Sequence, residues 1–335
     1  MKGGITIARR KGAKRRAEKR DWADLAEEQA KINLDSFPDQ DWSEFEADDD
    51  RSEIEKHEKS IDKQLEKLDQ AGSKFHWMKE KKYAQMFGQI EHKLTGALGV
   101  GKYDWVDRRV FDQVFDQSTL MAIYKLMQQD HIDTIEWPIA RGKEAHVFYA
   151  TSQSGPIAVK IFHTSNAVFK GLMQYIEGDP RFGGLRRRHR ELVNVWVQKE
   201  HRNLTRMRKH GVRTPESLVT YKNVLVMEYL GDENGPSPRL RDVDVEDPEE
   251  VFKSLLEQLR IIWQDAGLAH ADFSEYNIML HQGKTWIIDA GQAVVENHPK
   301  SKEFLVRDIT RLVQWANRNG VDADLAESTL YVIEE

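Results

Sequence analysis

Cysteine does not occur in this sequence of 335 residues. Its absence excludes a disulfide framework, a thiolate zinc site and a thiol nucleophile, and it fits an intracellular protein. Long apolar runs are also missing. None approaches the ~20 residues that a membrane span requires, and the N-terminus carries no apolar signal core. We therefore expect a cytoplasmic protein that has no part in a membrane.

Neither sign of charge dominates the chain, whose formal net charge is −6, but the two signs are separated along it. Residues 1–20 are rich in lysine and arginine and contain a single acid, Glu18. This basic arm could neutralise phosphates on a nucleic acid, or it could be a solvated tail. Residues 21–70 are acidic and are expected to be helical or disordered. The sequence thus predicts a charged N-terminal extension over residues 1–72.

A helical pattern of apolar residues follows this extension, over residues 73–136. Within it, a helix is predicted over residues 118–129, with Ser118 or Thr119 as its N-terminal cap. We expect the 73–136 segment to pack on the sheet that follows it.

Small residues mark a turn between two predicted strands in residues 139–150. Gly142 lies in this turn, and small residues there would let the backbone approach phosphate groups, as glycine-rich loops do. A plain hairpin would have the same pattern.

The next predicted strand, residues 157–162, contains one lysine among apolar residues. A lysine inside an apolar strand is costly unless its ammonium meets an anion. The following long helix, predicted from about Glu191 to His210, carries Glu200. That residue could be a solvated helix charge, but we expect it to pair with Lys160.

Asp272, Asn277 and Asp289 form the strongest chemical pattern. The first two stand in a His-x-Asp-x-x-x-x-Asn frame, and Asp289 ends a short apolar strand at residues 286–288. Phosphoryl transfer needs a carboxylate to orient the nucleophile, and an amide and a carboxylate oxygen to hold Mg²⁺ against the phosphates. These three residues have the order and approximate spacing that protein kinases use. Taken alone, an ordinary turn and a helix cap would also explain them.

Further motifs extend this pattern in a fixed order. They are Gly-Lys-Glu-Ala-His-Val (142–147), Lys160, Gly-Asp-Pro-Arg-Phe (178–182), Lys-Glu-His-Arg-Asn-Leu (199–204), Met-Glu-Tyr-Leu-Gly (227–231), His-Ala-Asp-Phe-Ser-Glu-Tyr-Asn (270–277) and Ile-Asp-Ala-Gly-Gln-Ala-Val (288–294). The set resembles the RIO-type atypical protein kinases, and most of all the first RIO subfamily in an archaeal-looking form. The resemblance covers roughly residues 110–320 and leaves the first hundred residues outside it.

The resemblance implies an α+β, bilobal protein-kinase-like fold. A small β-rich N-lobe would occupy residues 137–230, and a helical C-lobe would occupy residues 231–335. No activation segment is expected, because the chain runs from His298-Pro299 directly into a helix.

The resemblance also implies catalytic roles, with ATP and Mg²⁺ as cofactors. Asp272 would be the catalytic base, and Asn277 and Asp289 would bind Mg²⁺. Ser274 stands where ordinary protein kinases have a catalytic-loop lysine, so the charge of the γ-phosphate must be neutralised differently here. The residues that would bind ATP are Lys160 with its partner Glu200, the backbone of Glu228 and Leu230, and Gly142 and Lys143 in the turn.

RIO-type kinases are linked to maturation of the small ribosomal subunit, so the resemblance implies a pre-ribosomal particle as a partner. The basic arm, residues 1–20, would suit a ribosomal RNA surface. RIO-type kinases are also thought to cycle ATP partly as ATPases, through a phosphorylated aspartate at the position of Asp289. The sequence therefore predicts a Mg·ATP-dependent serine/threonine kinase, an ATPase or both.

Two other functions stay open. A small-molecule phosphotransferase of the aminoglycoside or choline kinase kind shares the bilobal fold and the His-x-Asp frame. The motif at residues 178–182 and the Ser-Glu-Tyr-Asn element argue against it. A catalytically idle scaffold for RNA or protein would have no need to keep Lys160, Asp272, Asn277 and Asp289 together.

Overall fold

The computed structural model describes residues 91–94, 114–164, 171–179, 181 and 189–334. Apart from Glu91 and His92, these residues belong to one compact unit. The predicted extension over residues 1–72 lies outside the described residues. Of the predicted 73–136 segment, the structure describes the short 3₁₀-helix η4 (Glu91–Leu94) and the part from residue 114. Within the described ranges, no helix has both the length and the apolar character that crossing a membrane requires.

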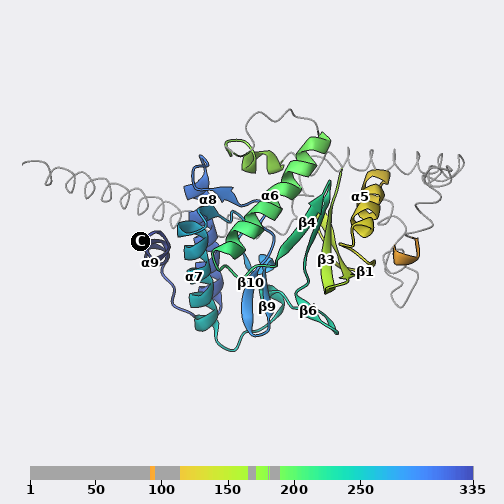
Figure 1. Cartoon of the computed structure of the whole chain (residues 1–335). Helices are drawn as coiled ribbons and strands as arrows, with labels where there is room; N and C mark the ends of the chain where they lie inside the picture. The colour runs from red at the N-terminus through yellow and green to blue at the C-terminus, as the bar shows by residue number, and fades with distance from the viewer. Residues whose placement is uncertain (1–90, 95–113, 165–170, 180, 182–188, 335) are drawn as a thin grey trace, which may run out of the picture. The chain divides into compact units, whose positions relative to one another are not determined.

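A five-stranded antiparallel sheet forms one half of the described unit (Figure 1). In spatial order its strands are β1 (Thr134–Arg141), β2 (Ala145–Ser152), β3 (Gly155–Phe162), β5 (Val224–Glu228) and β4 (Ser217–Tyr221). The strand–turn–strand predicted in residues 139–150 is confirmed, because β1 and β2 pair across a turn at residues 142–144.

The two faces of this sheet meet different helices. In Figure 1, α5 (Gln117–Gln128) lies on one side of the sheet and α6 (His189–Lys209) on the other. Side chains alternate along β2 and so point to opposite faces. The ring of Phe148 lies 5.4 Å from that of Phe115, just before α5. Val147 pairs with Lys160 of β3 on the other face, so the sheet presents Lys160 to α6.

The predicted cap of α5 is wrong by two or three residues. Asp116 caps the helix, because its extended backbone precedes Gln117 and its Oδ1 accepts a hydrogen bond from Thr119 N at 2.7 Å. An aspartate satisfies a free amide of the first turn as well as serine or threonine does. Its second oxygen accepts from the Thr164 hydroxyl at 3.0 Å, so Asp116 also fastens α5 to the end of β3.

Helices make up most of the other half of the unit. They are α7 (Pro248–Gln264), α8 (Ser301–Arg318) and α9 (Leu325–Ile333), which contact one another (Figure 1). The remaining short elements are β6 (Gly231–Asp232), β7 (Gly235–Pro236), β8 (Leu268–Ala269), β9 (Ile278–His281), β10 (Lys284–Ile287), β11 (Val294–Val295), η5 (Gly171–Tyr175), η7 (Leu240–Asp242) and η8 (Glu275–Asn277). The predicted β-rich N-lobe and helical C-lobe are confirmed, and the boundary at residue 230 stays a prediction.

Two small ribbons bring the important loops together. β9 and β10 form a hairpin whose two turn residues, Gln282 and Gly283, both have positive φ, as a type I′ turn requires. β8 pairs with β11. Residues 270–277 therefore begin at the ribbon where residues 289–293 end, so these two ends lie side by side.

His146, at the start of β2, makes the stability of the fold sensitive to acid. It is only 7% exposed, and its Nδ1 lies 3.1 Å from Nε2 of His163. Burial, followed by the positive charges of His163 and Arg141, lowers the pKa of His146 to about 4. An unfolded histidine titrates near pH 6.5. Between about pH 6.5 and pH 4 the unfolded state therefore binds more protons, so stability falls as the pH is lowered.

Urea unfolding between about pH 7 and pH 4 measures this effect. We expect the unfolding midpoint of His146→Gln to depend less steeply on pH than that of the wild type. His131→Gln, which changes an exposed histidine after α5, should keep the wild-type dependence. Parallel pH curves for the wild type and His146→Gln would contradict the prediction.

Candidate active site

Residues 270–277, here called the catalytic loop, are held from behind by α8. Ala271 N donates to Asp308 Oδ2 at 2.7 Å, and Phe273 N donates to Asp308 Oδ1 at 3.1 Å. Asp308 is fully buried, and this burial raises its pKa. The backbone on each side of Asp272 is therefore fixed, while the Asp272 side chain itself stays 22% exposed.

Two side chains hold the Asp272 carboxylate closely, and a third, Gln292, donates to Oδ2 at 3.5 Å. Asn277 Nδ2 donates to Asp272 Oδ2 at 2.8 Å and to its backbone oxygen at 2.9 Å. Arg311 Nη1 of α8 donates to Asp272 Oδ1 at 3.0 Å. Because the Asn277 amide nitrogen faces Asp272, its Oδ1 is the atom left to bind another group. The sequence predicted that Asp272 and Asn277 act together, but it did not single out Arg311.

Lys160 joins the sheet to α6 and to residues 289–293, here called the metal loop. Its Nζ donates to both oxygens of Glu200, at 2.8 and 3.0 Å, and lies 3.1 Å from Asp289 Oδ1. The predicted ion pair with Glu200 is present. Burial alone would lower the pKa of the Lys160 ammonium, but Asp289 and Glu200 outweigh it and raise the pKa above its ordinary value.

Asp289 has the features of a metal ligand. Its backbone is left-handed, at φ +59, and its side chain is 38% exposed although it touches Lys160. Burial would raise its pKa, but the Lys160 ammonium outweighs burial, so the pKa lies below its ordinary value. The carboxylate is therefore charged at neutral pH and can reach a ligand in the solvent.

The protein alone does not enclose a metal here. Among the described residues no group of three or more histidine, cysteine, aspartate or glutamate side chains could hold a metal ion. Mg²⁺ keeps several waters and is bound through one or two carboxylates together with substrate phosphates. The amide oxygen of Asn277 and the carboxylate of Asp289 fit a Mg²⁺ ion that is shared with a nucleotide.

The turn between β1 and β2 is tight and carries an acid that the sequence analysis did not assign. Gly142 N donates to Ala145 O at 2.9 Å, and a Cβ on Gly142 would lie 3.2 Å from that same oxygen. Gly142 and Lys143 are exposed. Burial, followed by the charge of Asp289, raises the pKa of Glu144 to about 8. Glu144 thus lies in the electrostatic field of the metal loop.

The remaining expected residues lie where the chain passes between the lobes and at the start of η8. Glu228 N donates to Glu216 O at 2.8 Å, and Leu230 O accepts from Ser237 N at 2.9 Å. Those bonds do not use the Glu228 carbonyl or the Leu230 amide, the groups expected to bind adenine. Ser274 caps η8 without a side-chain hydrogen bond. The roles of these residues stay predictions.

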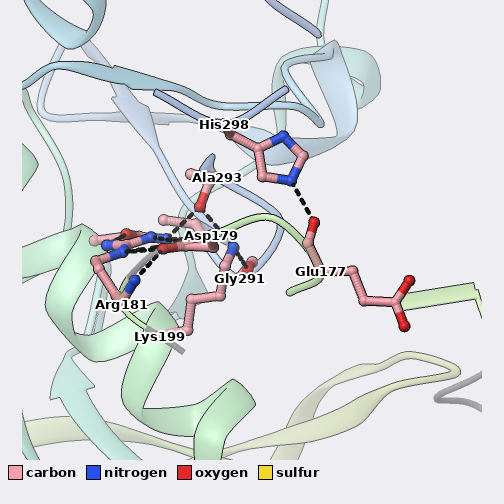
Figure 2. A network of polar contacts seen from close by, with 9 residues as sticks. Glu177, Asp179, Arg181, Lys199, Gly291, Ala293 and His298 are labelled. Atoms are coloured by element: carbon pink, nitrogen blue, oxygen red, sulfur yellow. Dashed lines mark hydrogen bonds and ion pairs between the residues drawn. The ribbon is translucent and has the colours of Figure 1, made fainter. Parts of the chain in front are cut away.

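Two α6 side chains, Lys199 and Asn203, hold the backbone of the metal loop, and Figure 2 shows Lys199 with Gly291 and Ala293. Lys199 Nζ donates to the carbonyl oxygens of Gly291 and Ala293, at 2.7 and 2.6 Å. Asn203 Nδ2 donates to those of Ala290 and Ala293, both at 2.8 Å. The helix that fixes Lys160 therefore also fixes three residues of the metal loop, Ala290, Gly291 and Ala293.

An ion pair between Asp179 and Arg181 lies beside Lys199 and supports this part of α6 (Figure 2). Arg181 Nη1 donates to Asn203 Oδ1 at 2.8 Å, and Arg181 Nη2 lies 2.7 Å from Asp179 Oδ2. Lys199 is completely buried, and burial together with the charge of Arg181 lowers its pKa to about 7. The motifs at residues 178–182 and 199–204 did not indicate the bond between Arg181 and Asn203, because no local pattern pairs residues 22 positions apart.

The chain is similar to a known family over most of the region just described. The RIO domain model matches residues 146–329, more than half of the 335 residues. The RIO-type serine/threonine-protein kinase Rio1 of Haloferax volcanii is 42% identical over 217 residues, 64% of this chain and 74% of that protein. Rio1 of Methanocaldococcus jannaschii is 33% identical over 226 residues, 68% of this chain and 78% of that protein. Human serine/threonine-protein kinase RIO1 is 35% identical over 223 residues, 65% of this chain but 39% of that protein.

A solved structure supports the fold. The crystal structure of the Rio2 kinase–ADP/Mg²⁺–phosphoaspartate complex from Chaetomium thermophilum aligns with a TM-score of 0.51 and 20% identity. The alignment covers 64% of this chain and 66% of that one. At this identity the likeness shows the fold alone, and it confirms the kinase-like bilobal architecture. With the match to the RIO domain and to Rio1 proteins, the chain belongs to the RIO family, as a RIO-type serine/threonine-protein kinase of the Rio1 subfamily.

Proposed function

We propose that the site around Lys160 transfers the γ-phosphoryl group of Mg·ATP. The observation that carries this proposal is that a single buried ammonium contacts Glu200 at 2.8 Å and Asp289 at 3.1 Å. Glu200 orients Lys160, while Asp289 remains partly exposed. Lys160 can therefore bind phosphate oxygens at the point where a metal held by Asp289 would meet them.

The other residues divide the work of the transfer. Asp272 accepts the proton of the attacking hydroxyl as its oxygen bonds to the γ-phosphorus. The bond to the bridging oxygen breaks, and its electron pair leaves with ADP. Mg²⁺ held by Asn277 and Asp289 would neutralise phosphate charge. The backbone of Glu228 and Leu230 would hold adenine, and Gly142 and Lys143 would cover the triphosphate beside Ser274.

Asp289 offers a second route, in which the protein turns over ATP without another substrate. The Rio2 kinase complex named above contains a phosphoaspartate with ADP and Mg²⁺. By that likeness, a carboxylate oxygen of Asp289 would attack the γ-phosphorus and ADP would leave. Water would then hydrolyse the acyl phosphate and release inorganic phosphate. The lowered pKa of Asp289 supports this route, because the carboxylate is the nucleophilic form.

The partner we propose is a precursor of the small ribosomal subunit. Its support is the basic arm, residues 1–20, whose lysines and arginines could neutralise ribosomal RNA phosphates. A precursor that binds in this way could be a substrate of the kinase reaction or an activator of ATP turnover, and both can be tested.

A single-turnover reaction with γ-labelled ATP and Mg²⁺ tests the function, with and without purified small-subunit precursors. Hydroxylamine cleaves acyl phosphates and leaves phosphoserine intact. Hydroxylamine-sensitive label that disappears in Asp289→Asn would indicate the ATPase route, and hydroxylamine-stable label on serine would indicate a protein kinase. Asp322→Asn, which changes an exposed carboxylate after α8, is the matched control and should label like the wild type.

The remaining outcomes contradict the proposal. Neither label nor released phosphate would favour the scaffold. Label transferred only to a small aminoglycoside or choline acceptor would favour the small-molecule phosphotransferase. A precursor that changes neither the rate nor the labelled product would exclude the ribosomal partner.

A further inference from the structure

The catalytic loop lacks a positive charge where phosphoryl transfer needs one. Residues 270–277 contain neither lysine nor arginine, and Ser274 stands two residues after Asp272. As the γ-phosphoryl group moves, negative charge remains spread over its oxygens, and fixed donors near those oxygens lower the barrier. Lys160 contacts Glu200 and Asp289, and so lies on the side of the site that contains the metal loop. The side of the site that contains Asp272 therefore needs another cation.

Arg311 of α8 lies at that side. Its Nη1 is 3.0 Å from Asp272 Oδ1, and the two side chains are 24% and 22% exposed. Asp272 Oδ2 is used by Asn277, so the carboxylate is held at both oxygens by two different elements. Hydrogen bonding fixes the direction in which the carboxylate can accept a proton. Partial exposure leaves both groups accessible to a substrate.

The position of Arg311 is set by the rigid attachment of α8. One turn earlier on the same helix, Asp308 accepts the amides of Ala271 and Phe273 at 2.7 and 3.1 Å. Arg307 Nη2 donates to the Ala271 carbonyl. Residues three and four apart lie on one face of a helix. The face of α8 that clamps the catalytic loop is thus also the face that carries Arg311.

The guanidinium has the capacity for a second anion. It carries five N–H donors in a rigid plane, and such a plane can bind a carboxylate with one edge and a phosphate with another. Within the described part of the chain, the contact of Arg311 with Asp272 uses one of its nitrogens. Donors of the same guanidinium remain for a phosphoryl group that lies next to Asp272.

We propose that Arg311 is a further catalytic residue of this kinase. It holds the Asp272 carboxylate through Nη1 and binds γ-phosphoryl oxygens through its other N–H groups during transfer. It supplies from α8 the charge that the catalytic loop lacks. Arg311 exchanges no proton, since Asp272 takes the proton of the attacking hydroxyl and ADP takes the electron pair of the broken bond. This role rests on the proposed function of Asp272.

Turnover and nucleotide affinity of full-length variants separate this role from a structural one. We expect Arg311→Gln to lower kcat about 10²–10³-fold, the usual effect of losing a donor to transition-state charge. The Kd for Mg·ATP, measured by calorimetry, should stay within about threefold, because the contact strengthens only in the transition state. Arg311→Lys keeps the charge without the planar fork and should recover about tenfold of the loss.

A matched control exists on the same helix. Arg318 binds both oxygens of Glu275, at 2.8 and 2.9 Å, and so also links α8 to the beginning of η8, but it does not touch Asp272. Arg318→Gln should keep kcat within about twofold of the wild type, since exposed ion pairs add little. Guanidinium ion at millimolar concentration should restore part of the turnover of Arg311→Ala and none of the turnover of Asp272→Asn.

The outcomes are distinguishable. Wild-type kcat in Arg311→Gln, while Asp272→Asn is inactive, overturns the role of Arg311 and leaves the proposed function standing. Equal losses of kcat in Arg311→Gln and Arg318→Gln would mean that both arginines only hold α8 against the catalytic loop. That outcome would overturn the catalytic role of Arg311. If Arg311→Gln fails to fold, the kcat of Arg311→Lys decides. Wild-type kcat in Arg311→Lys would contradict the proposal that the planar guanidinium binds the phosphoryl oxygens. Turnover of Asp272→Asn within tenfold of the wild type would instead refute the proposed function of Asp272, on which the role of Arg311 rests.

Discussion

Asp272→Asn is expected to lower the single-turnover rate by about 10³- to 10⁴-fold and to leave Mg·ATP bound. Loss of a general base lowers a rate by about 10²–10⁴-fold, and the expected effect lies in the upper part of that range. Asparagine keeps the shape of the side chain but cannot accept the hydroxyl proton. Its amide nitrogen must also face either Asn277 or Arg311, both of which are donors to Asp272. The reactive geometry is therefore weakened as well.

Quenched-flow measurement with labelled ATP gives the rate, and calorimetry gives the affinity. Asp322→Asn controls for the exchange of a carboxylate for an amide and should react like the wild type. A rate of Asp272→Asn within tenfold of the wild type would remove Asp272 from the role of base. A large loss of Mg·ATP affinity would show that the variant has disturbed the metal site instead.

Asp289→Asn is expected to remove the Mg²⁺ dependence of ATP binding. Asp289 is the one acidic member of the proposed ligand pair, and Mg²⁺ strongly prefers charged oxygen ligands. The affinity for Mg²⁺ should fall at least as much as the roughly 10–100-fold that losing a partner around a metal ligand costs. ATP without Mg²⁺ should bind the variant no worse than the wild type, because one negative charge beside the phosphates has gone.

Asparagine is the appropriate replacement at this position. At φ +59 the backbone of Asp289 is left-handed, and asparagine tolerates this conformation, whereas alanine pays about 1–2 kcal/mol for it. Titration of the protein with ATP at several Mg²⁺ concentrations measures the effect, and thermal unfolding without Mg²⁺ checks that the variant is folded. Unchanged Mg·ATP affinity would exclude Asp289 as a ligand.

Much of the site could be predicted because it depends on short sequence patterns. A lysine in an apolar strand needs an anion, and the next long helix carries Glu200, so the pair followed from the cost of an uncompensated buried charge. The frame that contains Asp272 and Asn277 predicted that both serve one reaction, and the structure brings their side chains together. The same reasoning placed the cap of α5 at Ser118 or Thr119. It failed because several neighbouring side chains can cap a helix, and the backbone conformation of Asp116 decided between them.

The rest depends on contacts between distant segments. Nothing in the sequence around Arg311 indicates that it meets Asp272, because the packing of α8 against the catalytic loop brings them together. The partners of Lys199 are backbone carbonyls, which every residue has, so no residue type marks them in advance. Glu144 reads as part of a surface turn, and its raised pKa arises only when the turn folds towards the metal loop.

Three side chains of α6 fix two parts of the site at the same time. Glu200 fixes Lys160 of the sheet, while Lys199 and Asn203 fix the backbone of the metal loop. A slip of the helix by a single residue is about 1.5 Å along its axis. Such a slip would lengthen hydrogen bonds of 2.6–3.0 Å beyond their useful range, both at Lys160 and at the metal loop. The phosphate-binding lysine and the metal loop are therefore set in register together and lost together, and α6 makes the two halves of the site one cooperative unit.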